Sequence, residues 1–158
     1  MNIAVITYIA ALVAANLLVA WLGPWFSVVN SFMLIGLDLS LRDKLHDAWQ
    51  GKHLAIKLAS LILVAGFISW VINPASAQIA LASMVAFTSA MTADSLAYQA
   101  LRSKPWFVRS NGSNVAGALA DSVLFPTIAF GGFMPHIMAM QLASKVAGGF
   151  LWSFLLRK

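Results

Sequence analysis

Apolar residues fill the chain in six long stretches, and short polar segments separate one stretch from the next. A membrane-spanning helix needs about 20 apolar residues to cross the hydrocarbon core of a bilayer. The pattern therefore predicts an all-α, polytopic bundle of six transmembrane helices within a single domain, residues 1–158. The expected spans are about 3–22, 25–44, 54–73, 77–101, 112–133 and 135–156.

Turn-forming residues set most of these boundaries. Gly23-Pro24 follows the first apolar stretch, Asn73-Pro74 follows the third, and Asn111-Gly112-Ser113 precedes the fifth, where a polar side chain can cap the helix. Pro126 lies inside the fifth span, where we expect a bend or a tolerated proline. The first residues lack the positive segment of a secretory signal, so we expect the first stretch to be a true span.

Composition supports a membrane protein and excludes several other classes. The 158 residues are 61% hydrophobic and 9% charged, too few polar residues to cover a soluble globule. No cysteine is present, which rules out disulfides and thiol chemistry. The three histidines lack metal-ligand spacing, and no nucleophile elbow or phosphate-binding glycine loop occurs. We therefore expect no enzyme activity, no cofactor and no metal site.

The net charge of +5 comes from basic residues in short clusters between apolar stretches. This distribution argues against a nucleic-acid-binding face and favours membrane orientation. Lysine and arginine follow the second, fourth and sixth spans, at Arg42, Lys44, Lys52 and Lys57, at Arg102, Lys104 and Arg109, and at Arg157 and Lys158. By the positive-inside rule, both termini face the cytoplasm and the protein is a multi-pass component of the cytoplasmic (inner) membrane.

Ionisable residues inside the apolar stretches are the candidate functional groups. Asp38, Asp94, Asp121 and Lys145 lie at membrane depth, where a charged side chain is costly and usually faces the interior of a bundle. Asp38 with Arg42, Asp94 with Tyr98, and Gln141 with Lys145 are i, i+4 pairs on their helices. In the fifth span, Asn114, Asp121 and Phe125 share one stripe. We expect these groups to converge on a polar pocket.

The deep ionisable groups comprise three aspartates, Asp38, Asp94 and Asp121, and two cations, Arg42 and Lys145. One aspartate is therefore left without an ionic partner. That residue is a candidate carrier of a coupling proton or a hydrogen-bond acceptor for a substrate. The alternative is structural, with the aspartates linking helices through Asn16, Asn30 or backbone groups.

Several motifs, taken in order, resemble the VUT (vitamin uptake transporter-like) family of queuosine precursor transporters. They comprise Asn16-Leu17-Leu18-Val19, the run Phe32–Arg42 ending in Asp-Leu-Ser-Leu-Arg, Ala82–Phe87 followed by Asp94, Ser113-Asn114, Asp121-Ser122, Phe125, Ala129-Phe130 and Lys145-Val146. The resemblance implies six helices, a fold similar to the substrate-binding components of energy-coupling-factor importers, and uptake of a 7-deazaguanine such as preQ0 or preQ1. This chain is shorter than the usual member, and its fifth span carries glycine and alanine where bulkier residues are common.

A deazaguanine suits the polar residues on chemical grounds as well. A carboxylate can accept its adjacent N–H donors, amide and ammonium groups can donate to its carbonyl, and aromatic side chains can stack on the ring. The expected substrate-binding residues are Asn16, Asp38, Arg42, Asp94, Tyr98, Asn114, Asp121, Phe125, Gln141 and Lys145. The partners expected are this small molecule and the lipid bilayer, with no nucleic acid; the sequence gives no prediction of oligomeric state.

Two other functions remain open at this stage. The chain could be the substrate-binding subunit of an ATP-driven importer for a vitamin-like molecule, which would need an ATPase module. It could also be a structural membrane protein without a ligand.

Overall fold

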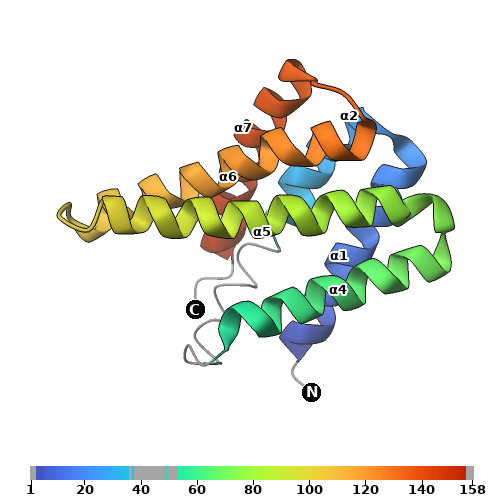
Figure 1. Ribbon diagram of the computed structural model, residues 1–158, viewed down its shortest axis with the longest axis horizontal. Coiled ribbons are helices and arrows are strands. Elements are labelled where there is room, and N and C mark those ends of the chain that lie inside the picture. Colours follow the sequence, from blue (N-terminus) through green and yellow to red (C-terminus); the bar gives the residue numbers. More distant parts are fainter. Residues whose placement is uncertain (1–2, 36, 38–48, 50–52, 156–158) are drawn as a thin grey trace.

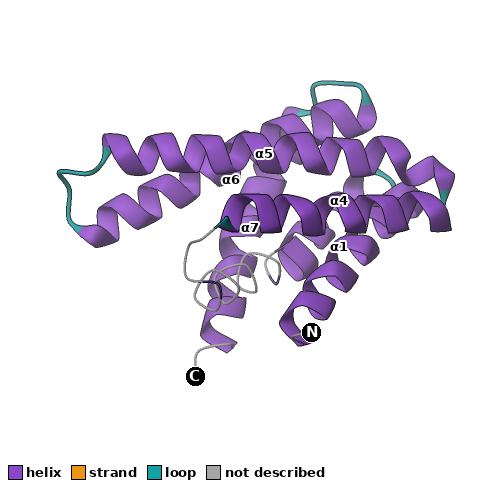
Figure 2. Ribbon diagram, turned by 60° about the horizontal axis from the view of Figure 1, so that its bottom comes forward, coloured by secondary structure: helices purple, strands orange, loops and turns teal. Residues whose placement is uncertain are grey.

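A computed structural model describes residues 3–35, 37, 49 and 53–155, and every regular element in these ranges is helical. The prediction of an all-α fold is therefore confirmed (Figures 1 and 2). The helices are α1 (Ile3–Leu22), α2 (Pro24–Asn30), α4 (Leu54–Ile72), α5 (Ala77–Ala100), α6 (Trp106–Phe130) and α7 (Pro135–Leu155), with a π-helix η1 (Ser31–Ile35) and a 3-10 helix η2 (Pro74–Ser76).

Helices α5 and α6 form a long antiparallel hairpin, which is the most extensive helix pair in the described part of the chain. Helix α4 returns beside α5 and packs on α1. Helix α7 crosses behind α6 in Figure 1 and contacts α2 and η1 as well. The result is a bundle in which α7 lies between α6 on one side and α2 on the other.

Three turns carry residues that suit them, and two of these, at Gly23-Pro24 and Asn73-Pro74, are the turns predicted from the sequence. Gly23 adopts a φ of 77° between α1 and α2, and Gly131 adopts a φ of 68° at the end of α6, a region of backbone conformation that favours glycine. The Asn73 side chain accepts a hydrogen bond from the backbone N–H of Ala75 at 3.1 Å and so caps η2. These turns place α1 against α2, α4 against α5 and α6 against α7.

Helix α6 begins six residues earlier than the sequence predicted. Its first residue is Trp106, immediately after Pro105, and the expected cap Asn111-Gly112-Ser113 lies inside the helix. A proline before the first turn costs no helical hydrogen bond, because the first N–H groups of a helix have no internal partner. The polar residues that suggested a loop are therefore part of a helix that extends the α5–α6 hairpin.

The second predicted span has an irregular start. Helix α2 passes directly into the π-helix η1 at Ser31. Beside this turn, Gly148 of α7 approaches so closely that a Cβ atom built on it would lie 2.3 Å from the carbonyl oxygen of Phe32. A glycine is therefore required for α7 to pack against η1.

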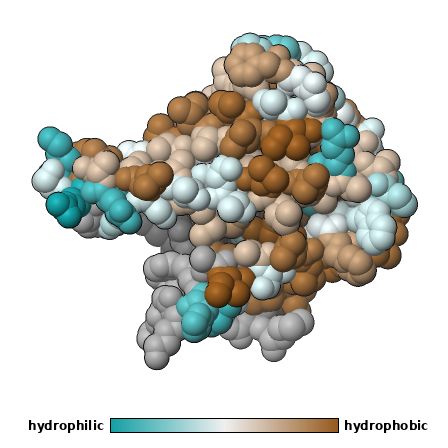
Figure 3. Space-filling model, viewed as in Figure 1, coloured by the Kyte–Doolittle hydropathy of each residue, from teal (hydrophilic) through white to brown (hydrophobic). Residues whose placement is uncertain are grey.

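Apolar side chains cover both the interior and much of the outer surface. One buried cluster, Tyr8, Leu58 and Ile62, joins α1 to α4, and a second, Val19, Ile79, Ala82 and Ala129, joins α1, α5 and α6. Large apolar side chains such as Phe67, Leu96 and Leu119 are exposed, and the face shown in Figure 3 is largely hydrophobic. Such a surface suits a lipid environment.

Among the described residues, three helical segments are long and apolar enough to cross a membrane: Ile3–Leu22, Pro74–Ala100 and Gly112–Phe130. Helix α4 contributes a shorter apolar stretch, Ile56–Ile72. The protein is thus a polytopic helical bundle. The fuller expectation of six spans includes residues outside the described ranges.

Candidate functional site

Polar side chains are buried between the helices of this apolar bundle. The nearly inaccessible ones in the described part of the chain are Asn16, Ser27, Asn30, Ser31, Ser69, Ser76, Ser113, Ser122, Gln141 and Lys145. Polar groups in such an environment need partners, because neither lipid nor hydrocarbon side chains can hydrogen-bond to them. The partners they find define a chain of contacts around Lys145 and a separate group around Asn16.

Lys145 of α7 forms an ion pair with the carboxylate of Asp121 on α6. Its ammonium group also donates to the hydroxyl of Ser122 at 3.1 Å and to the side-chain oxygen of Gln141 at 3.4 Å. The Lys145 side chain is 4% exposed, whereas that of Asp121 is 23% exposed. The pair therefore has a buried positive partner and a negative partner that retains access to its surroundings.

Gln141 extends these contacts to α2. Its amide nitrogen donates to the hydroxyl of Ser27 at 2.7 Å, and Ser27 in turn donates to the backbone carbonyl of Pro24. Gln141 is fully buried, as a residue one turn before Lys145 on the inner face of α7 should be. A continuous chain of hydrogen bonds thus runs from α6 through α7 to α2; we call it the Lys145 network, comprising Ser27, Asp121, Ser122, Gln141 and Lys145.

Asn16 belongs to a different polar group. Its amide nitrogen donates to Ser69 of α4 at 3.3 Å, and its amide oxygen accepts from Ser83 of α5 at 2.9 Å. Ser69 also donates to the carbonyl of Ala65 on its own helix. With both ends of its amide satisfied, Asn16 holds α1, α4 and α5 together.

Asp94 lies beside the α5–α6 contact, and its buried carboxylate oxygen Oδ1 has no hydrogen-bond partner within the described ranges. Gly117 of α6 allows this approach, because a Cβ atom built on it would meet the Cβ of Asp94 at 3.3 Å. Asp121 is one helical turn further along α6, about 6 Å in rise. The two aspartates therefore lie at successive levels of the same hairpin.

Two aromatic side chains follow Asp121 along α6. The rings of Phe125 and Phe130 meet edge to face, with centroids 6.1 Å apart. Phe125 is one turn from Asp121 and packs against the cluster that contains Val19 and Ala129. This position would bring an aromatic ring next to a ligand held by Asp121.

The other predicted site residues are placed differently. Tyr98 and Asn114 are exposed, towards the end of the α5–α6 hairpin that carries the connection 101–105. Asp38 and Arg42 lie outside the described residues, so the structure does not test the predicted ion pair between them. The structure brings the predicted residues Asp121, Gln141 and Lys145 together. It also places Ser27 in the network, a residue that sequence reasoning missed because its spacing along the chain does not distinguish it from a serine that only packs.

A cavity of about 320 Å³ lies elsewhere, between α4 and α5. Its lining is mainly apolar: Ala59, Ile62, Leu63, Met84, Val85, Phe87, Thr88 and Ser89. It offers few hydrogen-bond partners to a polar heterocycle. The Lys145 network is therefore the stronger candidate for ligand binding.

Comparison with known families agrees with a transport role. The family described as "Putative vitamin uptake transporter" matches residues 1–156, almost the entire chain. The chain belongs to this family. The predicted resemblance is thereby confirmed, and the vitamin uptake family implies a multi-pass membrane transporter with a small-molecule substrate. No curated protein and no solved structure shows significant similarity to the chain.

Proposed function

We propose that this member of the vitamin uptake family imports a queuosine precursor, a 7-deazaguanine such as preQ0 or preQ1, into the cytoplasm. The single observation that carries the proposal is the Lys145–Asp121 ion pair between α6 and α7 of an apolar bundle, with a buried ammonium group and a partly accessible carboxylate. Charged residues within a membrane protein mark substrate or ion pathways by default. The motifs shared with queuosine precursor transporters narrow the substrate class.

The chemistry of the network matches a guanine-like ring. Asp121 keeps free acceptor capacity, because Lys145 occupies one of its two oxygens, and a carboxylate can take two adjacent N–H donors of the ring. The donors of Lys145 and Ser122 suit the ring carbonyl. Phe125, one turn away, supplies an aromatic surface for stacking.

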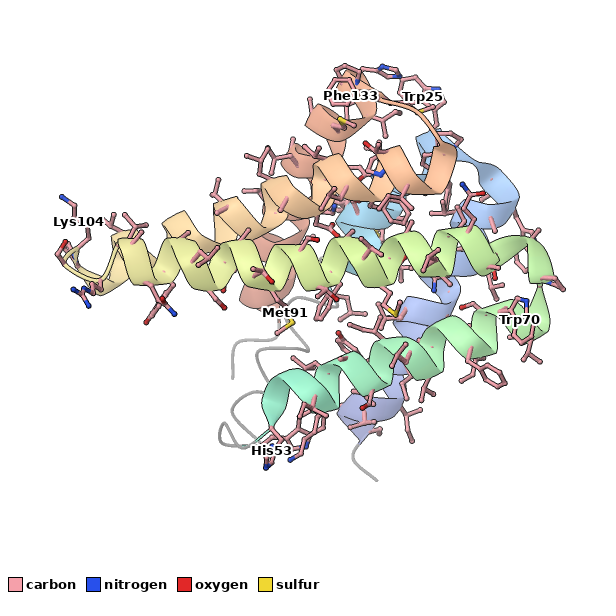
Figure 4. All side chains as sticks on the ribbon, viewed as in Figure 1. Trp25, His53, Trp70, Met91, Lys104 and Phe133 are labelled. Carbon is pink, nitrogen blue, oxygen red and sulfur yellow. The ribbon has the colours of Figure 1, made fainter. Side chains whose placement is uncertain are left out.

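The arrangement of the chain supports the proposed orientation, with both termini in the cytoplasm. Lys104 and His53 lie towards one end of the bundle, and Trp25, Trp70 and Phe133 lie towards the other (Figure 4). Basic residues are concentrated at the end with Lys104, and cytoplasmic loops of membrane proteins carry such an excess of lysine and arginine. Tryptophan is common at both membrane interfaces, so the tryptophans do not distinguish the two sides. Import would then carry the substrate from the end with Trp25 to the end with Lys104.

The decisive experiment measures queuosine in tRNA from cells that cannot make the precursors, supplied with a limiting amount of external precursor. Expression of the chain should restore queuosine, and Asp121→Asn should reduce it to the level of cells without the chain. Thr127→Val is a matched control on the same helix, because the Thr127 hydroxyl donates to the carbonyl of Val123 four residues earlier on α6. It should transport as the wild type does.

Membrane insertion must be verified for both variants by fluorescence-detected size exclusion. Wild-type queuosine levels with a correctly inserted Asp121→Asn protein would remove Asp121 from the site. Uptake by the purified protein alone in liposomes, with and without a proton gradient, tests the proposal that a proton is the coupling ion. Uptake only when an ATPase module is added would instead identify a substrate-binding subunit of an ATP-driven importer.

A further inference from the structure

Asn30, at the end of α2, has a buried side chain with only one end of its amide satisfied. The residue is 5% exposed. Its nitrogen Nδ2 donates to the backbone carbonyl of Ala15 on α1 at 3.0 Å, whereas its buried oxygen Oδ1 has no hydrogen-bond partner among the residues that the structure describes. An unsatisfied buried acceptor is rare in a folded protein and calls for a physical explanation.

The direction of this amide is fixed by its neighbour. The Ala15 carbonyl can only accept a hydrogen bond, so the nitrogen must face α1 and the oxygen must face the other way. A reversed amide would set two oxygens against each other. Asn30 Oδ1 is therefore a buried acceptor held in a fixed direction, and an N–H donor that reached it would satisfy it.

Asn30 lies at the level of Lys145, because α2 and α7 run in the same direction. Trp25 contacts His136, Ser27 contacts Gln141 and Phe32 approaches Gly148, so the numbers rise together along both helices. From the Ser27–Gln141 contact, Asn30 is about 4.5 Å and Lys145 about 6 Å further along their helix axes. Asn30 also shares the face of Ser27, three residues before it.

The backbone around Asn30 gives a second, independent indication. The π-helix η1 begins at the next residue, Ser31. Short π-helical segments within α-helices occur frequently at functional sites. The free acceptor is thus located where the α2–η1 segment departs from regular geometry, at the axial level of Lys145.

We propose that Asn30 Oδ1 accepts the pyrrole N–H of the substrate and so selects the free base over its nucleoside. This inference rests on the proposed function. With the two adjacent donors of the pyrimidine edge bound by Asp121, the remaining ring donor of a 7-deazaguanine is the pyrrole N–H. A ribose attached to that nitrogen removes the donor and adds bulk next to a buried, immobile acceptor. Hydrogen bonding to a substrate donor gives strong selection against analogues that lack it.

The test measures binding of three ligands to the purified full-length protein in lipid nanodiscs: 7-deazaguanine, its furan analogue with oxygen in place of the pyrrole N–H, and 7-deazaguanosine. The wild type should bind the base on the order of 10- to 100-fold more tightly than the furan analogue, which has nearly the same shape. Asn30→Ala should lower affinity for the base by a similar factor. The same substitution should leave affinity for the furan analogue nearly unchanged, and it should reduce the preference for base over nucleoside.

Asn73→Ala is the matched control, since it removes an asparagine whose oxygen only caps η2. Equal affinity of the wild type for the base and its furan analogue would overturn the inference without any variant. So would equal weakening of both ligands by Asn30→Ala, which would make Asn30 a structural residue. If the wild type binds the base and Asp121→Asn does not, the proposed function stands. In that case, failure of Asn30→Ala to change the affinities as expected rejects only the role given to Asn30. If the wild type binds no deazaguanine, the proposed function fails with it.

Discussion

At the scale of single residues, the bundle concentrates its polar chemistry on a few side chains with unequal burial. Lys145 is more buried than Asp121, and an ammonium group at that depth is tolerated only while its partners remain. Removing one member of a buried pair leaves the other uncompensated, which usually costs more than removing both. The pair is therefore expected to show strong coupling in stability as well as in transport.

Lys145→Met should lower the free energy of unfolding by about 2 kcal/mol, between the values for exposed and fully buried pairs because Asp121 is partly accessible. The double variant Asp121→Asn with Lys145→Met should regain part of this loss, while uptake stays absent in both. Thermal unfolding in detergent measures the effect. A double variant as unstable as the sum of the two single variants would contradict the coupling.

Sequence reasoning identified part of the site for physical reasons. Gln141 and Lys145 are four residues apart, and helical geometry alone places them together. The scarcity of cations at membrane depth predicted that Lys145 would have an acidic partner, but the sequence did not identify that partner as Asp121. The contribution of Ser27 depends on how α2 packs against α7, which no local pattern encodes.

At the scale of the elements, close helix packing depends on particular glycines. Gly148 faces the backbone of Phe32 in η1, which cannot move aside as a side chain could. Gly66 of α4 has ordinary space, because a Cβ atom there would lie 3.5 Å from the Cβ of Ala80. The two positions therefore differ in what they tolerate, although both are helical glycines in the same bundle.

Gly148→Ala should destabilise the protein by about 1–3 kcal/mol, the usual cost of forcing extra atoms into a packed contact. Gly66→Ala should be neutral or stabilising by up to about 1 kcal/mol, because alanine favours helix. The midpoint of thermal unfolding in detergent, compared among the two variants and the wild type, provides the measurement. Equal behaviour of the two would show that α7 does not need this approach to η1.

The elements were predictable where apolar length and turn residues agree. The spans expected at 3–22, 54–73 and 135–156 correspond closely to α1, α4 and α7. The early start of α6 was not foreseen, because polar residues after Trp106 resemble a loop until α5 is present to pair with them. The π-helix η1 was not foreseen either, since Phe32–Ile35 is an ordinary apolar run.

At the scale of the whole molecule, the two ends of the bundle differ in charge and are proposed to face opposite sides of the membrane. The natural sequence contains no cysteine. Single cysteines can therefore be introduced as reporters without removing any native thiol.

Lys104→Cys should react with a membrane-impermeant maleimide only from the cytoplasmic side, and Phe133→Cys only from the opposite side. Both residues are exposed, and they lie towards opposite ends of the bundle (Figure 4). Labelling of intact cells and of inverted membrane vesicles distinguishes the two. Reaction of both cysteines from one side would rule out the proposed topology.

All three N–H donors of Lys145 are already in use, and this affects how a ligand can bind. An ammonium group has three N–H bonds, and those of Lys145 are already directed at Asp121, Ser122 and Gln141. A ligand carbonyl arriving at this nitrogen must replace one of them, and the contact with Gln141 is the longest. Substrate binding would then disturb Gln141, the residue that ties α7 to α2, because the substrate and Gln141 compete for the same N–H donor of Lys145.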